Sequence, residues 1–260
     1  MKQMTLDYVD RELFKLKKMK VGAMTHPRTP LCIVLDFSGS MNPYRDQIVS
    51  ILRNLTKELN GVDKRFFTLI IIGIFNGRPR IWYFGDLKEL DVEDLIFELP
   101  DQCRGTTPLV ESFQLADHYL TEVSKACESS TQICTIPFYI IITDAKSTET
   151  RENYTGILKT LAEDTANNRK IVVECYTREN EDGLDFGGYK IVMDHEGSEA
   201  EIENCMKALR LASSSNVDQT KGVFEQKSRP PKSNRSAYCD YMSTILAGNM
   251  LFYFSNLNSR

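Results

Sequence analysis

The chain of 260 residues contains no apolar run of the ~20 residues needed to span a bilayer. The longest candidate, residues 245–254, is interrupted by Gly248 and Asn249. The first residues lack the basic stretch and the apolar stretch of a secretory signal. A basic excess is also missing, because the formal net charge is −4 and the pI about 5.6. We therefore expect neither a membrane span nor a nucleic-acid partner.

The seven cysteines are odd in number, and no Cys-x-x-Cys spacing occurs among them. Cys32 and Cys175 lie in strand-like runs, and Cys205 lies on the apolar face of an expected helix. This pattern is typical of buried, reduced thiols rather than of a disulfide framework. We therefore expect a cytoplasmic protein.

Several enzyme signatures are absent. The sequence has no Gly-x-x-x-x-Gly-Lys-Ser/Thr and no Gly-x-Gly-x-x-Gly phosphate loop, and no Gly-x-Ser-x-Gly elbow surrounds Ser38 or Ser40. The three histidines, His26, His118 and His195, are not placed by the sequence beside a candidate nucleophile. These absences favour a binding protein over an enzyme.

The most informative stretch is the apolar run 31–37, which reads as a buried strand and breaks into the pattern Asp36-x-Ser38-x-Ser40. Side chains two residues apart can project to the same side of an extended chain. A carboxylate and two hydroxyls without a nearby histidine or cysteine form a set of hard oxygen ligands. Such a set suits Mg²⁺ or Mn²⁺.

Two later residues can complete this oxygen set. A second apolar strand, residues 138–143, ends at Asp144, and Thr107 stands at a loop-to-helix junction. In a parallel sheet the carboxyl ends of the strands share one edge, where ligands bind. We therefore expect Asp36 and Asp144 to lie at the same edge of one sheet. An ordinary structural role for Thr107 is open too, as the N-cap of a helix that starts at Pro108.

Strands alternate with helices along most of the chain, in units of about 30 residues that are typical of a parallel sheet. The strand at 66–75, the turn Asn76-Gly77 and the return strand at 80–84 predict one β-hairpin. The predicted fold class is α/β, with three αβα layers and a mostly parallel central sheet that has one antiparallel edge strand. Helices are expected at 6–18, 48–59, 92–97, 107–123, 154–162 and 202–212, and the remaining strands at 171–176 and 189–193.

The domain organisation has three predicted parts. Residues 1–29 form a charged leader that is helical to about Lys18, and residues 30–215 form the α/β domain. Residues 216–260 form a basic linker, with Pro230-Pro231, and an apolar C-terminal extension.

The order Asp36-x-Ser38-x-Ser40, then Thr107, then Asp144 resembles the metal-ion-dependent adhesion site (MIDAS) of von Willebrand factor type A (VWA) domains. The resemblance implies a Rossmann-like VWA fold. It also implies that the two serines bind a divalent cation directly and that the threonine and the aspartates bind it directly or through water. The implied cation is Mg²⁺, or Mn²⁺ or Ca²⁺, and a partner protein donates an Asp or Glu to it. The implied function is a scaffold or adaptor.

One position departs from the pattern of the family. Asp144 is followed by Ala145, where many relatives have glycine. We expect this alanine to stiffen the loop.

Segments 30–41, 105–109 and 189–215 are similar to cytoplasmic bacterial VWA proteins of the TerY type. That resemblance implies a role in tellurium resistance or stress, beside a protein kinase and a serine/threonine phosphatase. A VWA partner of an AAA+ ATPase and a phage-defence component are alternatives. A metal-dependent hydrolase or phosphatase that uses the same cation site is the alternative function. A phosphatase of the haloacid-dehalogenase type is excluded, because Ser38 stands where its second aspartate would be.

Overall fold

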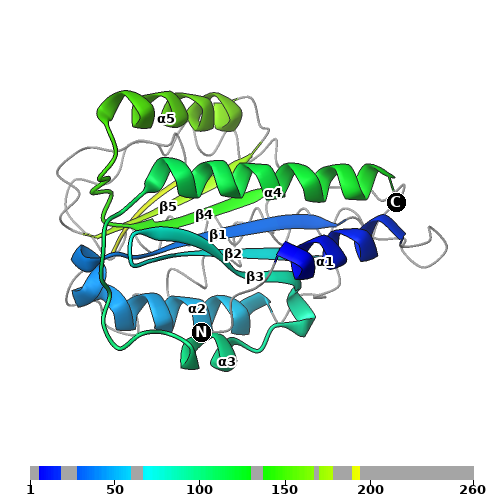
Figure 1. Ribbon diagram of the computed structural model, residues 1–260, viewed down its shortest axis with the longest axis horizontal. Coiled ribbons are helices and arrows are strands. Elements are labelled where there is room, and N and C mark those ends of the chain that lie inside the picture. The colour runs from blue at the N-terminus through cyan, green and yellow to red at the C-terminus, as the bar shows by residue number, and fades with distance from the viewer. Residues whose placement is uncertain are drawn as a thin grey trace, which may run out of the picture.

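The computed structural model describes residues 6–18, 28–59, 67–129, 137–166, 170–177 and 189–193, which form a layered α/β domain (Figure 1). The strands are β1 (Thr29–Phe37), β2 (Phe67–Phe75), β3 (Arg78–Asp86), β4 (Phe138–Thr143), β5 (Ile171–Thr177) and β6 (Tyr189–Met193). The α-helices are α1 (Leu6–Lys18), α2 (Arg45–Leu59), α3 (Val92–Phe97), α4 (Leu109–Ser129) and α5 (Arg151–Ala166). Two 3₁₀ helices, η2 (Gly39–Tyr44) and η4 (Leu87–Glu89), are also present.

The described strands form one sheet in the order β3-β2-β1-β4-β5-β6. Neighbouring strands are parallel except for β2 and β3, which pair antiparallel as a hairpin. The hairpin turn consists of Asn76 and Gly77, with φ angles of 52° and 75°. These left-handed angles are those that a two-residue hairpin turn requires. The predicted fold class, with its single antiparallel edge strand, is therefore confirmed.

A hydrophobic core lies on each face of the sheet. The side chains of β1 contribute to both cores, because they alternate between the two faces. Leu31, Ile33 and Leu35 pack in the core that contains the buried residues of α2 and α3. Cys32 and Val34 pack in the core formed with α1, α4 and α5. Figure 1 shows α4 and α5 on one side of the sheet and α2 and α3 on the other.

Helix α1, which the sequence places in the charged leader, contributes to the second core. Val9, Leu13 and Leu16 lie one helical turn apart and are all buried against it. The expected helix at 202–212 and the expected linker and extension at 216–260 lie outside the described residues. None of the helices in the described ranges is both long and apolar enough to cross a membrane.

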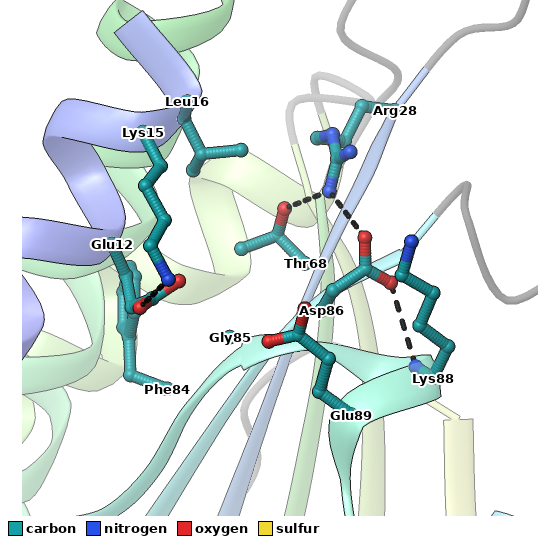
Figure 2. A pocket seen from close by; sticks show the side chains of 10 residues that line it. All are labelled: Glu12, Lys15, Leu16, Arg28, Thr68, Phe84, Gly85, Asp86, Lys88 and Glu89. Atoms are coloured by element: carbon teal, nitrogen blue, oxygen red, sulfur yellow. Dashed lines mark hydrogen bonds and ion pairs between the residues drawn. The ribbon is translucent and has the colours of Figure 1, made fainter. Parts of the chain in front are cut away.

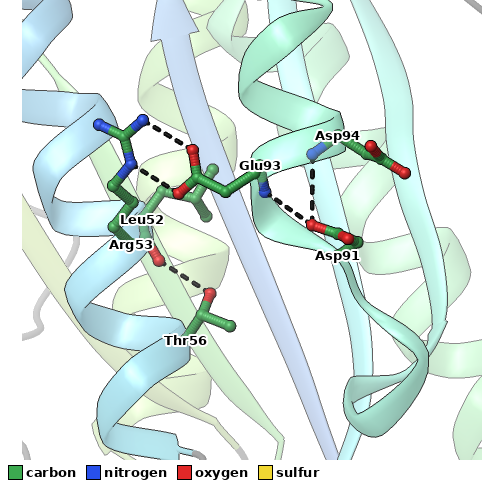
Figure 3. A network of polar contacts seen from close by, with 6 residues as sticks. All are labelled: Leu52, Arg53, Thr56, Asp91, Glu93 and Asp94. Atoms are coloured by element: carbon green, nitrogen blue, oxygen red, sulfur yellow. Dashed lines mark hydrogen bonds and ion pairs between the residues drawn. The ribbon is translucent and has the colours of Figure 1, made fainter.

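Helix α3 begins at a side-chain cap. The Asp91 carboxylate accepts hydrogen bonds from the backbone amides of Glu93 (3.0 Å) and Asp94 (3.4 Å), as Figure 3 shows. Glu93 also forms two 2.8 Å hydrogen bonds with Arg53 of α2. This ion pair attaches α3 to α2 at the surface.

The Asp91 cap gives a first prediction. Replacement by alanine leaves the first amides of α3 without their acceptor and is expected to lower the free energy of unfolding by about 1 kcal/mol. Arg53→Ala, which removes an exposed ion pair, is expected to cost less, about 0.5 kcal/mol. Urea denaturation of the two variants measures both. An equal or reversed order would contradict the assignment of Asp91 as the cap.

Candidate metal centre

The candidate site lies where the strand order reverses. From β1 the chain moves outward to β2 and β3 and then returns to β4 on the other side of β1. In open α/β sheets such a reversal leaves a crevice at the carboxyl ends of the two strands, where ligands bind. Leu35 of β1 pairs with Ile142 of β4. Asp36 therefore stands beside Thr143, and Asp144 follows directly.

Asp36 is fully buried, and both oxygens of its carboxylate accept hydrogen bonds. Oδ1 accepts from the Ser38 amide (2.8 Å), and Oδ2 accepts from the Thr143 hydroxyl (2.7 Å). Burial raises the pKa of Asp36 to about 6; hydrogen bonds from Thr143 and Ser38 oppose this rise, and the nearby Asp144 carboxylate adds to it. The folded chain therefore holds two mutually repelling carboxylates in a poorly solvated place. A divalent cation between them would offset both costs.

The two serines face each other across the loop after β1. The Ser38 and Ser40 hydroxyl oxygens are 3.3 Å apart. Ser38 is buried and Ser40 is exposed, so this hydroxyl pair leads from the buried Asp36 to the surface. The loop is fixed by the Gly39 amide, which donates to the Gly105 carbonyl (3.0 Å).

The two carboxylate oxygens of Asp144 differ in their contacts. Its Oδ1 accepts from the Lys146 amide (3.1 Å), while its buried Oδ2 has no hydrogen-bond partner among the described residues. A buried carboxylate oxygen without a donor is costly unless a cation approaches it. Thr107, which is also buried, belongs to the same unit, because its carbonyl accepts from the Thr148 amide (3.2 Å) of the loop that follows Asp144.

The segment that precedes Thr107 is held tightly. The Arg104 amide donates to the Phe37 carbonyl (3.2 Å) at the end of β1. Gly105 has a φ of +90°, and a Cβ on it would stand 2.5 Å from backbone atoms of Asn76 and Gly77. The tip of the β2–β3 hairpin therefore packs against the loop that carries Thr107, and only glycine fits between them.

The donor set fits a hard divalent cation. The structure brings together two carboxylates and hydroxyl-bearing residues, the donors that Mg²⁺, Mn²⁺ and Ca²⁺ accept. The described ranges contain no metal-binding group of three or more His, Cys, Asp or Glu residues. The five residues singled out from the sequence, Asp36, Ser38, Ser40, Thr107 and Asp144, come from three segments that contact one another directly.

Two residues of this region were not among those singled out from the sequence. Thr143 donates to Asp36 and accepts from the Ala145 amide (3.0 Å), so it joins the end of β1 to the loop that contains Asp144. The in-register pairing of β1 with β4 would have indicated it. Glu149 accepts hydrogen bonds from the first amides of α4. No local sequence signal points to that contact, because 38 or 39 residues separate the partners.

A cavity of about 100 Å³, lined by both charged and apolar side chains, lies at the amino-terminal end of β1, opposite the candidate site (Figure 2). The buried Arg28 guanidinium donates to Thr68 Oγ1 (3.0 Å) and lies 3.6 Å from the Asp86 carboxylate. Lys15, paired with Glu12 at 2.6 Å, closes one side. The charges that line this cavity are balanced within the chain, which indicates a structural role.

The fold and the candidate site define an α/β protein with a cluster of oxygen-bearing side chains at the switch point of its sheet. No protein-family model matches the chain, and no curated protein matches its sequence. Among solved structures, the pilus adhesin SpaC from Lactobacillus rhamnosus GG is similar at 12% identity and a TM-score of 0.51, over 71% of this chain and 31% of that one. At this identity the likeness shows the fold alone.

Two other solved structures have TM-scores just below 0.5. The VWA domain of SpRpn10 is 13% identical, with a TM-score of 0.46, over 68% of this chain and 94% of that one. Manganese-loaded Plasmodium vivax TRAP protein is 15% identical, with a TM-score of 0.48, over 66% of this chain and 71% of that one. The structures similar to this chain thus include VWA domains.

Proposed function

We propose that this chain is a metal-dependent protein-binding module of the VWA type, a scaffold or adaptor rather than an enzyme. Its cation site consists of Asp36, Ser38, Ser40, Thr107 and Asp144. The observation that carries the proposal is the pair of buried acids at the switch point of the sheet, one with a raised pKa and the other with an unpaired buried oxygen. Both features are unfavourable in the chain alone and favourable beside a cation.

The proposed ion is Mg²⁺, with Mn²⁺ or Ca²⁺ as possible replacements. Mg²⁺ is usually held by one or two carboxylates and keeps several of its waters. Held by Asp36 and Asp144, such an ion would keep positions for exchangeable ligands, and Ser40 is the exposed member of the proposed set. The proposed occupant of one such position is an Asp or Glu of a partner protein.

The proposed setting is the bacterial cytoplasm, in a stress-response or defence system. Support comes from the TerY-type resemblance and from Cys32, Cys103, Cys127 and Cys175, which are all buried. Burial raises the pKa of Cys103 to about 11, as for an unreactive thiol. A kinase and phosphatase pair or an AAA+ ATPase is the proposed kind of partner.

The alternative, a metal-dependent hydrolase, needs a general base beside the ion. Among the described residues, the hydrogen-bond partners of the Asp36 carboxylate are Ser38 and the Thr143 hydroxyl, and neither accepts a proton near neutral pH. A general base here would have to be one of the two carboxylates that are proposed to bind the ion. For this reason we prefer the binding function.

The experiment is an affinity purification with the unmodified chain and with Asp36→Ala, each with Mg²⁺ and with EDTA, followed by mass spectrometry. The expected result is one set of proteins that is retained by the unmodified chain with Mg²⁺ and lost in the other three conditions. Circular dichroism checks that the variant is folded. Partners that persist through both chelation and the substitution would refute the metal-bridged mechanism.

A further inference from the structure

The loop after β4 contains a strained residue. Ala145 has a φ of +64°, a left-handed conformation that side chains with a Cβ rarely adopt. It directly follows Asp144, and it is itself buried in the core under α4 and α5. Glycine would adopt this conformation without strain, so the loop needs other contacts to hold it.

Short-range hydrogen bonds supply part of the restraint. The Ala145 amide donates to Thr143 Oγ1 (3.0 Å), the Lys146 amide donates to Asp144 Oδ1 (3.1 Å), and the Ser147 amide donates to the Ala145 carbonyl (3.0 Å). These bonds shape the loop internally. They do not attach it to the segment that carries Thr107.

Glu149 makes that attachment. Its Oε2 accepts from the Val110 amide (2.5 Å) and its Oε1 from the Glu111 amide (3.2 Å), in the first turn of α4. Ser147 Oγ lies 3.3 Å from Oε2. The first amides of a helix lack acceptors within the helix and carry partial positive charge, so they bind a carboxylate well.

Thr107 is joined to the same loop by its backbone. Its carbonyl accepts from the Thr148 amide (3.2 Å), with the Ser147 hydroxyl 3.5 Å away. Residues 144–149 and the start of α4 therefore form one unit in which Asp144 and Thr107 keep a fixed relation.

We propose that Glu149 is a positioning residue for the cation site: by capping α4 from the loop that follows Asp144, it holds the strained Ala145 conformation and so directs Asp144 toward Asp36 and Thr107. This inference rests on the proposed function, because it assumes that a cation binds there. Loss of an outer-sphere contact of this kind typically weakens metal binding about 10- to 100-fold.

The test measures Mn²⁺ affinity by electron paramagnetic resonance, with Mn²⁺ alone as the probe. Glu149→Ala is expected to bind Mn²⁺ about 10- to 100-fold more weakly than the unmodified chain. Glu149→Gln, which keeps one acceptor oxygen, is expected to lose less. Glu111→Ala is the matched control, since it removes an exposed acid from the same helical turn, and its affinity is expected to be unchanged.

A second substitution separates positioning from general support of the fold. Ala145→Gly relieves the left-handed strain, so the loop depends less on the hydrogen bonds of Glu149. In the Glu149→Ala background it is expected to restore Mn²⁺ affinity to within about threefold of the Ala145→Gly single variant, in line with the relief of backbone strain.

Three outcomes would overturn the inference. If the Mn²⁺ affinity of Glu149→Ala is within about twofold of that of the unmodified chain, Glu149 is only a helix cap, while the proposed function stands. If Glu149→Ala is weaker but Ala145→Gly does not restore binding, the loss does not arise from the Asp144 loop. If the unmodified chain binds no Mn²⁺, the inference and the proposed function both fail.

Discussion

Asp36→Asn is expected to remove divalent-cation binding while raising the stability of the metal-free chain. The substitution keeps the size of the side chain and deletes its charge. Cation affinity should fall about 100-fold or more, because one of the two proposed carboxylate ligands is lost. In EDTA at pH 7, the free energy of unfolding should rise by up to about 3 kcal/mol, because burial raises the pKa of Asp36 to about 6 in the folded chain.

The sign of the stability effect follows from the raised pKa of Asp36. Below about pH 4 this group is protonated in both the folded and the unfolded chain, and it costs nothing. As the pH rises toward 6, the unfolded chain loses the proton first, so the folded state loses stability. Above pH 6 the folded state is destabilised by the full free energy of burying the charged Asp36 carboxylate. The stability gain of Asp36→Asn should therefore grow between pH 4 and pH 6 and stay level above that.

The asparagine keeps one of the two hydrogen bonds unchanged, because its carbonyl can accept from the Ser38 amide. At Thr143 the direction reverses: the asparagine amide group donates to the hydroxyl, which loses its present acceptor. Asp46→Asn is the control, because that carboxylate is 96% exposed and pairs only with its neighbour Arg45 among the described residues. Thermal unfolding in EDTA and in Mg²⁺ measures each variant. A lower melting temperature for Asp36→Asn in EDTA would contradict the view that Asp36 is destabilising until a cation binds.

Gly105→Ala is expected to destabilise the chain by about 3–5 kcal/mol, from left-handed strain and from overpacking together. The new Cβ would stand 2.5 Å from Asn76 C and from Gly77 N, which are backbone atoms of the hairpin turn and cannot rotate away. Either the hairpin or the loop before Thr107 must move. Cation binding should therefore weaken as well, although residue 105 is not a ligand.

Gly39→Ala tests the same neighbourhood without the clash. A Cβ at Gly39 would meet its nearest atom at 3.6 Å, an ordinary contact, and the backbone there is not left-handed. This variant is expected to lose less than about 1 kcal/mol. Urea denaturation compares the two. Similar losses at both positions would mean that the hairpin does not constrain the loop that carries Thr107.

The sequence indicated the architecture because hydrophobic periodicity is local. The apolar run around Asp36, the Asn76-Gly77 turn and the short helix α3 each show their structure within ten residues. Strand β3 is longer than the predicted 80–84, because polar residues at both of its ends interrupt the apolar pattern on which the prediction rests. Its partly exposed first half, which includes Pro79, is the pattern of an edge strand.

The restraints around the candidate site were harder to predict, because they join distant segments. Thr107 was weighed as the N-cap of a helix that starts at Pro108. The helix begins at Leu109, whose amide donates to the Thr107 carbonyl (3.0 Å), and the carboxylate that accepts from the next two amides comes from Glu149. Nothing near Leu109 reveals a partner 40 positions later in the chain. Similarly, the Gly105 contact with Asn76 depends on how two loops meet above the sheet.

The most direct test of the central claim is a Mn²⁺ titration of the unmodified chain, Asp36→Asn and Asp144→Asn, followed by electron paramagnetic resonance, with Mg²⁺ as the competitor. We expect one Mn²⁺ site per chain that Mg²⁺ displaces and that both substitutions remove. Mn²⁺ binding that is equally strong in all three proteins would place the ion elsewhere and refute a cation site at Asp36 and Asp144.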